Sequence, residues 1–258
     1  MKRTCYIVSI LFIFSVPCFA SETNKGYEIM KAQKEQNIGF HDEKSVGRIV
    51  LVSKNLSKVT RSFNLSLLEG SEKTPEKSLY KITSPIDLQG VGLLFHENKE
   101  KENDQWLYLP ATKKTKRIVG SLKSGRFVGS EFTYEDLSKQ ELEDYDYKWM
   151  REETCAETLC DVVEVVPHKG KSLYAKTLVW VSQSNKQTKR IDFYDAKGAV
   201  FKQARIYGYK LYLNKYWRPW RIIMRHLQKK KESRLIIDKI ELNTGLSDAA
   251  FTKSVLER

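Results

Sequence analysis

The stretch RSFNLSLL, residues 61–68, alternates apolar and polar side chains. Phe63, Leu65 and Leu67 fall on one side of an extended chain, and the serine and asparagine residues between them fall on the other. A period of two with one apolar face is typical of a half-buried β-strand. We therefore expect a sheet that packs one face against an apolar interior.

Further stretches of this kind fill most of the chain, and short turns containing glycine or lysine separate them. A helix is predicted over residues 24–38, with Gly39 as a left-handed stop after it. Many antiparallel strands with few helices indicate a mainly β (α+β) domain, a sandwich or a barrel. The other predicted strands are residues 79–83, 90–96, 104–109, 113–119, 145–153, 161–166, 174–182, 186–195, 199–207, 220–228 and 234–243.

Residues 120–140 interrupt the strand pattern. A short helix is predicted at 133–137, and a long irregular insertion in a β-domain often serves as a lid or a binding loop. Carboxylates occur here, at Glu135 and Asp136, and again over residues 141–146. With Lys139 and Lys148 nearby, we interpret them as a solvated loop and not as a glycosidase pair.

The first twenty residues have the pattern of a secretory signal peptide. Lys2 and Arg3 precede a short apolar run, and small residues lead to a cleavage site after Ala20. A retained anchor is a weaker alternative because the run is short for a membrane span. A lipoprotein signal at Cys18 is also weaker because Pro17 precedes that cysteine. We expect an exported, periplasmic protein with a signal peptide at residues 1–20 and one domain at residues 21–258.

Export determines how the remaining cysteines are interpreted. Cys155 and Cys160 are an even pair, and an oxidising compartment favours a disulfide between them. Half of a metal site is the alternative, but the sequence lacks a second ligand pair at the required spacing. The four-residue gap also differs from that of thioredoxin-like redox motifs.

The charge of the chain is strongly basic. Its 45 Lys and Arg residues include only two before residue 21, so residues 21–258 carry a net charge of about +11. A basic surface attracts anionic partners. Export argues against nucleic acid and favours anionic lipid headgroups or an acidic protein, and a generally lysine-rich surface is the alternative.

No motif for catalysis, cofactor binding or metal binding was found. The four histidines are scattered, and the sequence has neither a Gly-x-Ser-x-Gly elbow nor a phosphate-binding or dinucleotide-binding loop. We therefore expect a protein that is not an enzyme and has no cofactor and no metal.

Three blocks in the middle of the chain are more specific. SPIDLQGVGLL (84–94) and DQWLYLPA (104–111), followed by FVGSEFTYEDL (127–137), resemble the outer-membrane lipoprotein-sorting protein family, which is LolA-like. Later segments fit as well, among them VWV (179–181), FYD (193–195) and YWRP (216–219). Val91–Gly92 and Val128 depart slightly from the family's pattern.

The resemblance implies a strongly curved antiparallel sheet, an incomplete β-barrel with helices in its concave face. It also implies an apolar interior that holds acyl chains of a lipid or an acylated lipoprotein. The cargo would pass to an outer-membrane acceptor, and some members of the family work beside inner-membrane exporters of the RND superfamily. On this basis we expect ligand contacts from Phe63, Leu65, Leu67, Leu94, Trp106, Tyr108, Phe127, Phe132, Tyr134, Trp180 and Phe193.

Three functions remain open at this point. The first is a monomeric carrier of lipid or lipoprotein, involved in lipoprotein sorting or lipid transport. The second is an accessory protein of an RND-type exporter that binds a partner protein. The third, an envelope hydrolase, has no support in the sequence. Aromatic residues on one face of the strands favour an ordinary filled core, and a sheet curled around a cavity is the alternative that the sequence leaves open.

Overall fold

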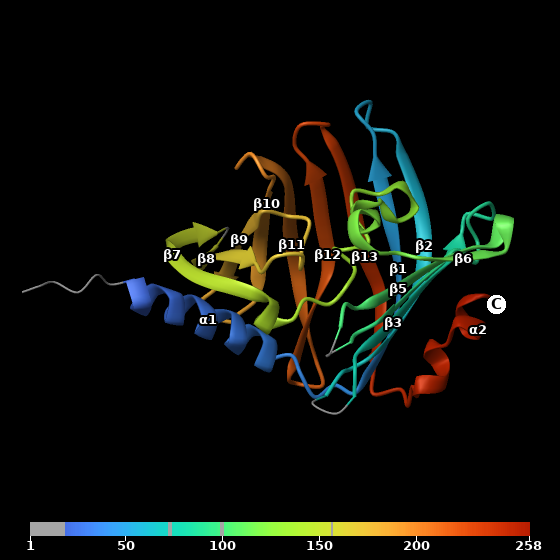
Figure 1. The fold of residues 1–258 in the computed structure, drawn as a ribbon, viewed down its shortest axis with the longest axis horizontal. Helices are drawn as coiled ribbons and strands as arrows, with labels where there is room; N and C mark the ends of the chain where they lie inside the picture. Colours follow the sequence, from blue (N-terminus) through green and yellow to red (C-terminus); the bar gives the residue numbers. More distant parts are fainter. Residues whose placement is uncertain (1–18, 72–73, 99–100, 156) are drawn as a thin grey trace, which may run out of the picture.

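The computed structural model describes residues 19–71, 74–98, 101–155 and 157–258, and its main feature is one antiparallel sheet. The strand order is β6-β5-β4-β3-β2-β1-β13-β12-β11-β10-β9-β8-β7. Because β6 and β7 are the two edges and do not pair with each other, the sheet is not closed (Figure 1). The strands are β1 (Asp42–Val52), β2 (Lys58–Leu68), β3 (Lys77–Ser84), β4 (Gly92–His96), β5 (Asp104–Leu109), β6 (Lys114–Arg117), β7 (Tyr145–Cys155), β8 (Thr158–Pro167), β9 (Lys176–Ser182), β10 (Thr188–Tyr194), β11 (Val200–Tyr212), β12 (Tyr216–His226) and β13 (Lys231–Leu242).

Every predicted strand overlaps an observed one, but the prediction omitted β1. This strand joins the two halves of the sheet, because it pairs with β2 on one side and with β13 on the other. Its sequence hides the period of two in two ways. The register shifts between Val46 and Gly47, and the run 49–52 is apolar on both faces.

The sheet curves around one apolar cluster. Ile82 and Leu93 from β3 and β4 belong to the same cluster as Phe193 from β10, although five strands lie between β3 and β10 in the sheet order. We call the side of the sheet that carries this cluster the inner face. Shifts of register in β1, β7 and β10, as at bulges, accompany the curvature.

The two helices lie at different places. α1 (Phe19–Glu35) packs against the edge strand β7, and a side chain at Gly26 would clash with the backbone of Lys148 and Trp149. α2 (Lys253–Leu256) packs on the side of β4 that faces away from the inner face, through Leu94 and Leu256. The predicted placement of helices in the concave face is therefore not confirmed.

The insertion between β6 and β7 consists of turns and short 3₁₀ helices. The helix predicted at 133–137 is absent, and this stretch forms successive turns. The 3₁₀ helices of the structure are η1 (Pro110–Thr112), η2 (Gly120–Ser124), η3 (Phe127–Gly129), η4 (Leu142–Asp144) and η5 (Asp248–Phe251). The insertion (green in Figure 1) crosses in front of the sheet and contributes to the inner cluster.

The predicted disulfide between Cys155 and Cys160 is confirmed, at the end of the β7–β8 hairpin. Neither helix in the described part of the chain combines the length and the apolar character needed to cross a bilayer. The predicted signal peptide falls largely on residues 1–18, outside the described residues.

Candidate functional site

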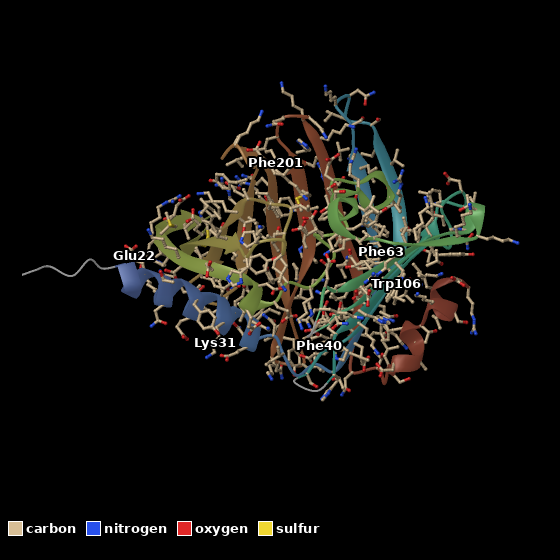
Figure 2. All side chains as sticks on the ribbon, viewed as in Figure 1. Glu22, Lys31, Phe40, Phe63, Trp106 and Phe201 are labelled. Carbon is tan, nitrogen blue, oxygen red and sulfur yellow. A yellow bond between two sulfur atoms is a disulfide. The ribbon has the colours of Figure 1, made fainter. Side chains whose placement is uncertain are left out.

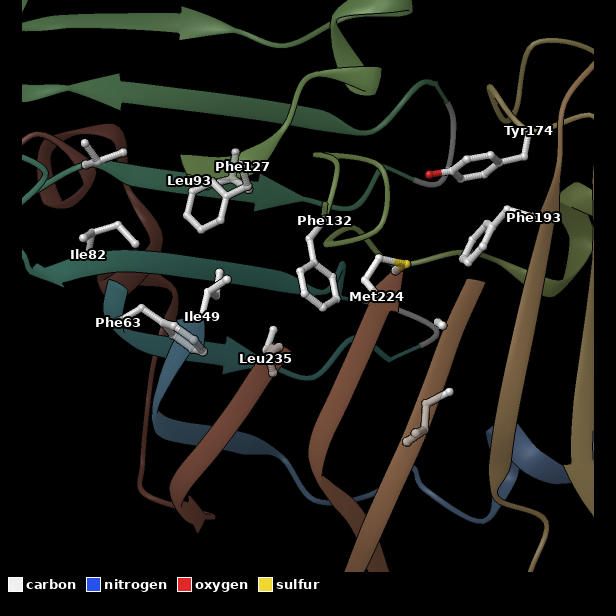
Figure 3. Packing of buried hydrophobic residues seen from close by; sticks show 13 residues of the cluster. Ile49, Phe63, Ile82, Leu93, Phe127, Phe132, Tyr174, Phe193, Met224 and Leu235 are labelled. Carbon is white, nitrogen blue, oxygen red and sulfur yellow. The ribbon is translucent and has the colours of Figure 1, made fainter. Parts of the chain in front are cut away.

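The inner face is lined by apolar side chains from eight strands. Phe63, Ile82 and Leu93 come from β2 to β4, and Met224 and Leu235 come from β12 and β13 (Figure 3). Each of these five is at most 7% exposed. The lining therefore forms a continuous apolar surface across the curved sheet.

Residues 126–137, which we call the inner cover, fill the space in front of this surface. Phe127 and Phe132 are 0% and 3% exposed and point into the cluster (Figure 3). Tyr134 and Leu137 pack against it. Side chains of an irregular segment thus cover the inner cluster in this structure.

A tight loop presents the two phenylalanines. The Phe127 amide donates to the Phe132 carbonyl at 2.9 Å, and Arg126 and Thr133 form a bridge that closes the loop. Val128 lies in the left-handed region, with φ 43° and ψ 37°. This conformation is strained for a β-branched residue, so the surrounding contacts must hold it.

Buried polar contacts attach the inner cover to the sheet. The Lys202 ammonium on β11 forms an ion pair with Asp136 of the cover and donates to the Tyr174 hydroxyl at 2.7 Å. The Tyr174 hydroxyl in turn donates to the other Asp136 oxygen at 2.8 Å. Lys202 is only 3% exposed, and its ammonium lies 4.9 Å from the centre of the Phe193 ring. Such a pair is costly to break from one side, because the remaining charge stays buried.

Glu135 adds a second attachment. Its carboxylate accepts hydrogen bonds from the Ser172 hydroxyl and, at 3.1 Å, from the Leu173 amide. Burial raises the pKa of Glu135, and these hydrogen bonds oppose that shift. The expectation that Glu135 and Asp136 form a solvated loop is therefore wrong, because both carboxylates are buried against the sheet.

A small polar cavity of about 40 Å³ lies beside the inner cover. Gln105 borders it, donates to the Tyr134 carbonyl at 2.9 Å, and leaves its buried side-chain oxygen without a partner among the described residues. The cavity is far too small for an acyl chain and has room for about one water molecule.

The end of the insertion joins an acidic cluster. The Lys139 ammonium lies 3.5 Å from Glu76, 3.5 Å from Glu97 and 3.2 Å from Glu141. Lys34 of α1 also contacts Glu141. Burial raises the pKa of Glu76 to about 7, with Lys139 opposing and the neighbouring carboxylates reinforcing that shift.

The predicted contact residues divide between two faces. Phe63, Leu65, Phe127, Phe132, Tyr134 and Phe193 meet in the inner cluster, and Leu67 lies two positions beyond Leu65 on the same strand. Leu94, Trp106 and Tyr108 instead pack with Phe251 and Leu256 on the opposite face. Figure 2 labels Phe63 on β2 and Trp106 on β5. Trp180 packs in a separate cluster with Cys160 and Val162.

Sequence reasoning missed the polar half of the site. Lys202 alternates with Ala204 and Ile206 on β11, so its position marks a charge on the inward face of a strand. Tyr174 gave no comparable signal. Within the described ranges, no group of three or more His, Cys, Asp or Glu side chains is placed to hold a metal ion.

A family model described as "-like: Uncharacterized protein" matches residues 74–258. Among solved structures, a candidate outer membrane lipoprotein-sorting protein domain from Vibrio parahaemolyticus is 36% identical with a TM-score of 0.87, over 92% of this chain and 100% of that one. A DUF1329 family protein from Desulfovibrio piger is 24% identical (TM-score 0.86), over 91% of this chain and 99% of that one.

A LolA superfamily protein from Nitrosomonas europaea is 22% identical with a TM-score of 0.71, over 89% of this chain and 98% of that one, and it shows the fold. No curated protein matches this sequence. Identity above 30% over whole chains identifies a family. The chain therefore belongs to the family of outer membrane lipoprotein-sorting proteins, and its fold is that of the LolA superfamily.

Proposed function

We propose that the protein is a periplasmic carrier that holds an acyl chain of a lipid or lipoprotein against the inner face of its sheet. One observation carries this proposal. The apolar lining of an unclosed, curved sheet is covered by an irregular segment and not by another layer of regular structure. Displacing Phe127 and Phe132 would uncover a surface that already has the apolar character an acyl chain needs.

The free energy gained by burying an acyl chain is comparable to the free energy needed to displace the inner cover. Burying a chain of about sixteen carbons is worth on the order of 10 kcal/mol at ~0.8 kcal/mol per CH₂ group. Moving the inner cover would separate Asp136 from Lys202, which costs about 3–5 kcal/mol for a buried pair broken from one side, and would expose two phenylalanine rings. A ligand can therefore compensate for opening the interior, and an unloaded protein stays closed.

The first test is native mass spectrometry of the protein purified from the periplasm, followed by lipid extraction. We expect acyl lipid or acylated peptide to co-purify. Phe132→Glu should abolish this, because the added carboxylate would face the apolar lining. Trp106→Glu is the matched control on the opposite face and should leave the lipid bound. An empty protein that also fails to take up added lipid would contradict the proposal.

The second candidate is an accessory protein of an RND-type exporter, and the outer face of the sheet favours it. The residues that alternate with the inner cluster on β10 to β13 include five arginines, against three carboxylates at Asp192, Glu232 and Asp238. Asp192 pairs with Arg190, and Glu232 pairs with Arg225 and Arg234. Such a surface would attract an acidic protein domain. This role predicts a stable protein complex, no bound lipid, and loss of the complex when two of these arginines become glutamate. They are Arg190, Arg205, Arg221, Arg225 and Arg234.

A further inference from the structure

Arg61 on β2 lies at the end of the inner cover and has an unusual environment. Its Nε atom is buried and has no hydrogen-bond acceptor among the described residues. Phe63, two positions along the same strand, belongs to the inner cluster, so the Arg61 side chain leaves the strand on the inner side. A buried guanidinium N–H without an acceptor is unfavourable unless something else binds there.

The loop of the inner cover lies directly against this guanidinium. A Cβ atom at Gly129 would come within 3.1 Å of Arg61 Nη1. Arg126 spans the same loop, donating to the Ser130 carbonyl at 2.8 Å and to the Gly129 carbonyl at 2.7 Å. Two guanidinium groups therefore meet at the strained turn of Val128.

The charges at this place do not balance. Glu131 neutralises Arg126 through an ion pair. The exposed carboxylate of Asp87 attracts the Arg61 guanidinium, but the two side chains form no ion pair. Burial lowers the pKa of Arg61, Asp87 opposes that shift, and Arg126 reinforces it. An additional anion would relieve both the missing acceptor and the repulsion between the cations.

We propose that Arg61, with Arg126, binds the phosphate of an anionic lipid headgroup whose acyl chain occupies the inner face. The inference rests on the proposed carrier function and adds the class of headgroup. The planar fork of arginine matches phosphate oxygens with two parallel hydrogen bonds, and partial burial strengthens them. Because Phe63 and Phe127 lie next to this turn, a chain that replaces the phenylalanine rings would continue directly into a phosphate at Arg61.

The test compares three probes by titration calorimetry with the full protein, below the micelle concentration of each lipid. Palmitoyl-lysophosphatidylglycerol carries chain and phosphate, 1-palmitoylglycerol carries the chain alone, and glycerol 3-phosphate carries the phosphate alone. We expect the first to bind about tenfold more tightly than the second, as one charge-assisted pair of hydrogen bonds predicts. Arg61→Gln should remove this preference and leave 1-palmitoylglycerol binding unchanged.

Two further variants separate the headgroup from folding. Arg61→Lys keeps the charge but loses the fork, so it should retain only part of the preference. Arg48→Gln is the matched control, because Arg48 lies opposite Ser62 on the neighbouring strand and pairs with Asp238 at 2.7 Å. It should retain the full preference.

The outcomes distinguish the headgroup site from the carrier function. Equal affinity for the two lipids, or an equal loss of both in Arg61→Gln, would overturn the phosphate site and leave acyl binding intact. Binding of glycerol 3-phosphate that depends on Arg61, with no lipid binding, would support a site for free phosphate and refute the carrier. Failure of all three probes to bind would contradict both.

Discussion

The two faces of β4 are covered in different ways. Leu93 points to the inner face and is covered by residues 126–137, whereas its neighbour Leu94 points outward and is covered by residues 246–256, which we call the outer cover. The outer cover packs through Phe251 and Leu256, and Lys81 of β3 donates to its Leu256 carbonyl at 2.6 Å. Its ion pair with β3, between Asp248 and Lys77, uses a carboxylate that is 73% exposed.

The inner cover differs because its own carboxylates are buried. Asp136 and Glu135 depend on partners from β11 and from the segment before β9. An apolar cover stays in place as long as the fold does. A cover held by buried ionic contacts has a defined closed position and can be released when those contacts are exchanged or titrated.

Breaking the ion pair of the inner cover should have the largest effect. Lys202→Met leaves the Asp136 carboxylate buried without its cation and should lower the free energy of unfolding by about 3–5 kcal/mol. Urea unfolding measures it. The double variant Lys202→Met with Asp136→Leu should recover most of the loss, because no charge then remains buried. A loss below about 1 kcal/mol in the single variant would show that the pair does not hold the cover.

Truncating the outer cover should destabilise the fold without affecting the interior. Leu256→Ala removes a side chain that is 0% exposed and should cost about 3 kcal/mol in thermal or urea unfolding. Binding of 1-palmitoylglycerol should be unchanged, because Leu256 is on the opposite face. The control Leu213→Ala, at an exposed turn, should stay within about 0.5 kcal/mol of the parent protein. Weaker lipid binding in Leu256→Ala would place the ligand on the outer face.

The acidic cluster at the end of the insertion should make the stability depend on pH. The folded state raises the pKa of Glu76 from 4.5 to about 7 and so binds a proton more tightly than the unfolded state. The contribution of this group is present below pH 4.5 and is lost as the pH rises through 7, by about 3 kcal/mol.

The Glu76→Gln variant has no titrating group at this position. Its free energy of unfolding should therefore fall less than that of the parent protein between pH 5 and 7.5. Urea unfolding at several pH values measures this difference. Glu241→Gln, at an exposed position, should behave like the parent protein. Parallel pH profiles of the parent protein and Glu76→Gln would contradict the shifted pKa.

Removing the disulfide should have the smallest effect and should not distinguish the two covers. The double variant Cys155→Ser with Cys160→Ser removes a disulfide between residues that are five positions apart. Because a short disulfide loop restricts the unfolded chain only modestly, the free energy of unfolding should fall by about 2 kcal/mol. The melting temperature with and without reductant measures it. Because the hairpin lies far from both covers in the sheet order, hydrogen exchange should change equally in both. Selective loosening of the inner cover would show a coupling that these contacts do not explain.

Local sequence patterns predicted most of the sheet, since alternation is visible wherever one face is apolar and the other polar, as at Phe63 to Leu67. The prediction from alternation failed at β1, where a bulge and a run buried on both faces remove the period of two. The family resemblance supplied the curvature, which depends on contacts between strands distant in sequence.

The site was only partly predictable for a related reason. In β4, Leu93 and Leu94 are both buried, so no pattern in the strand itself indicates which one faces the interior. The answer depends on the C-terminal segment, more than 150 residues away. The conformation of residues 126–137 likewise depends on Lys202 and Tyr174, which local sequence does not link to Asp136.

Hydrogen–deuterium exchange with and without palmitoyl-lysophosphatidylglycerol tests most directly whether the inner cover gives way to a ligand. The account predicts that the ligand increases exchange of the amides in residues 126–137, while those in residues 251–256 keep their protection. Bound ligand with unchanged or stronger protection of residues 126–137 would contradict it, because the inner face would then have stayed closed while the lipid bound elsewhere.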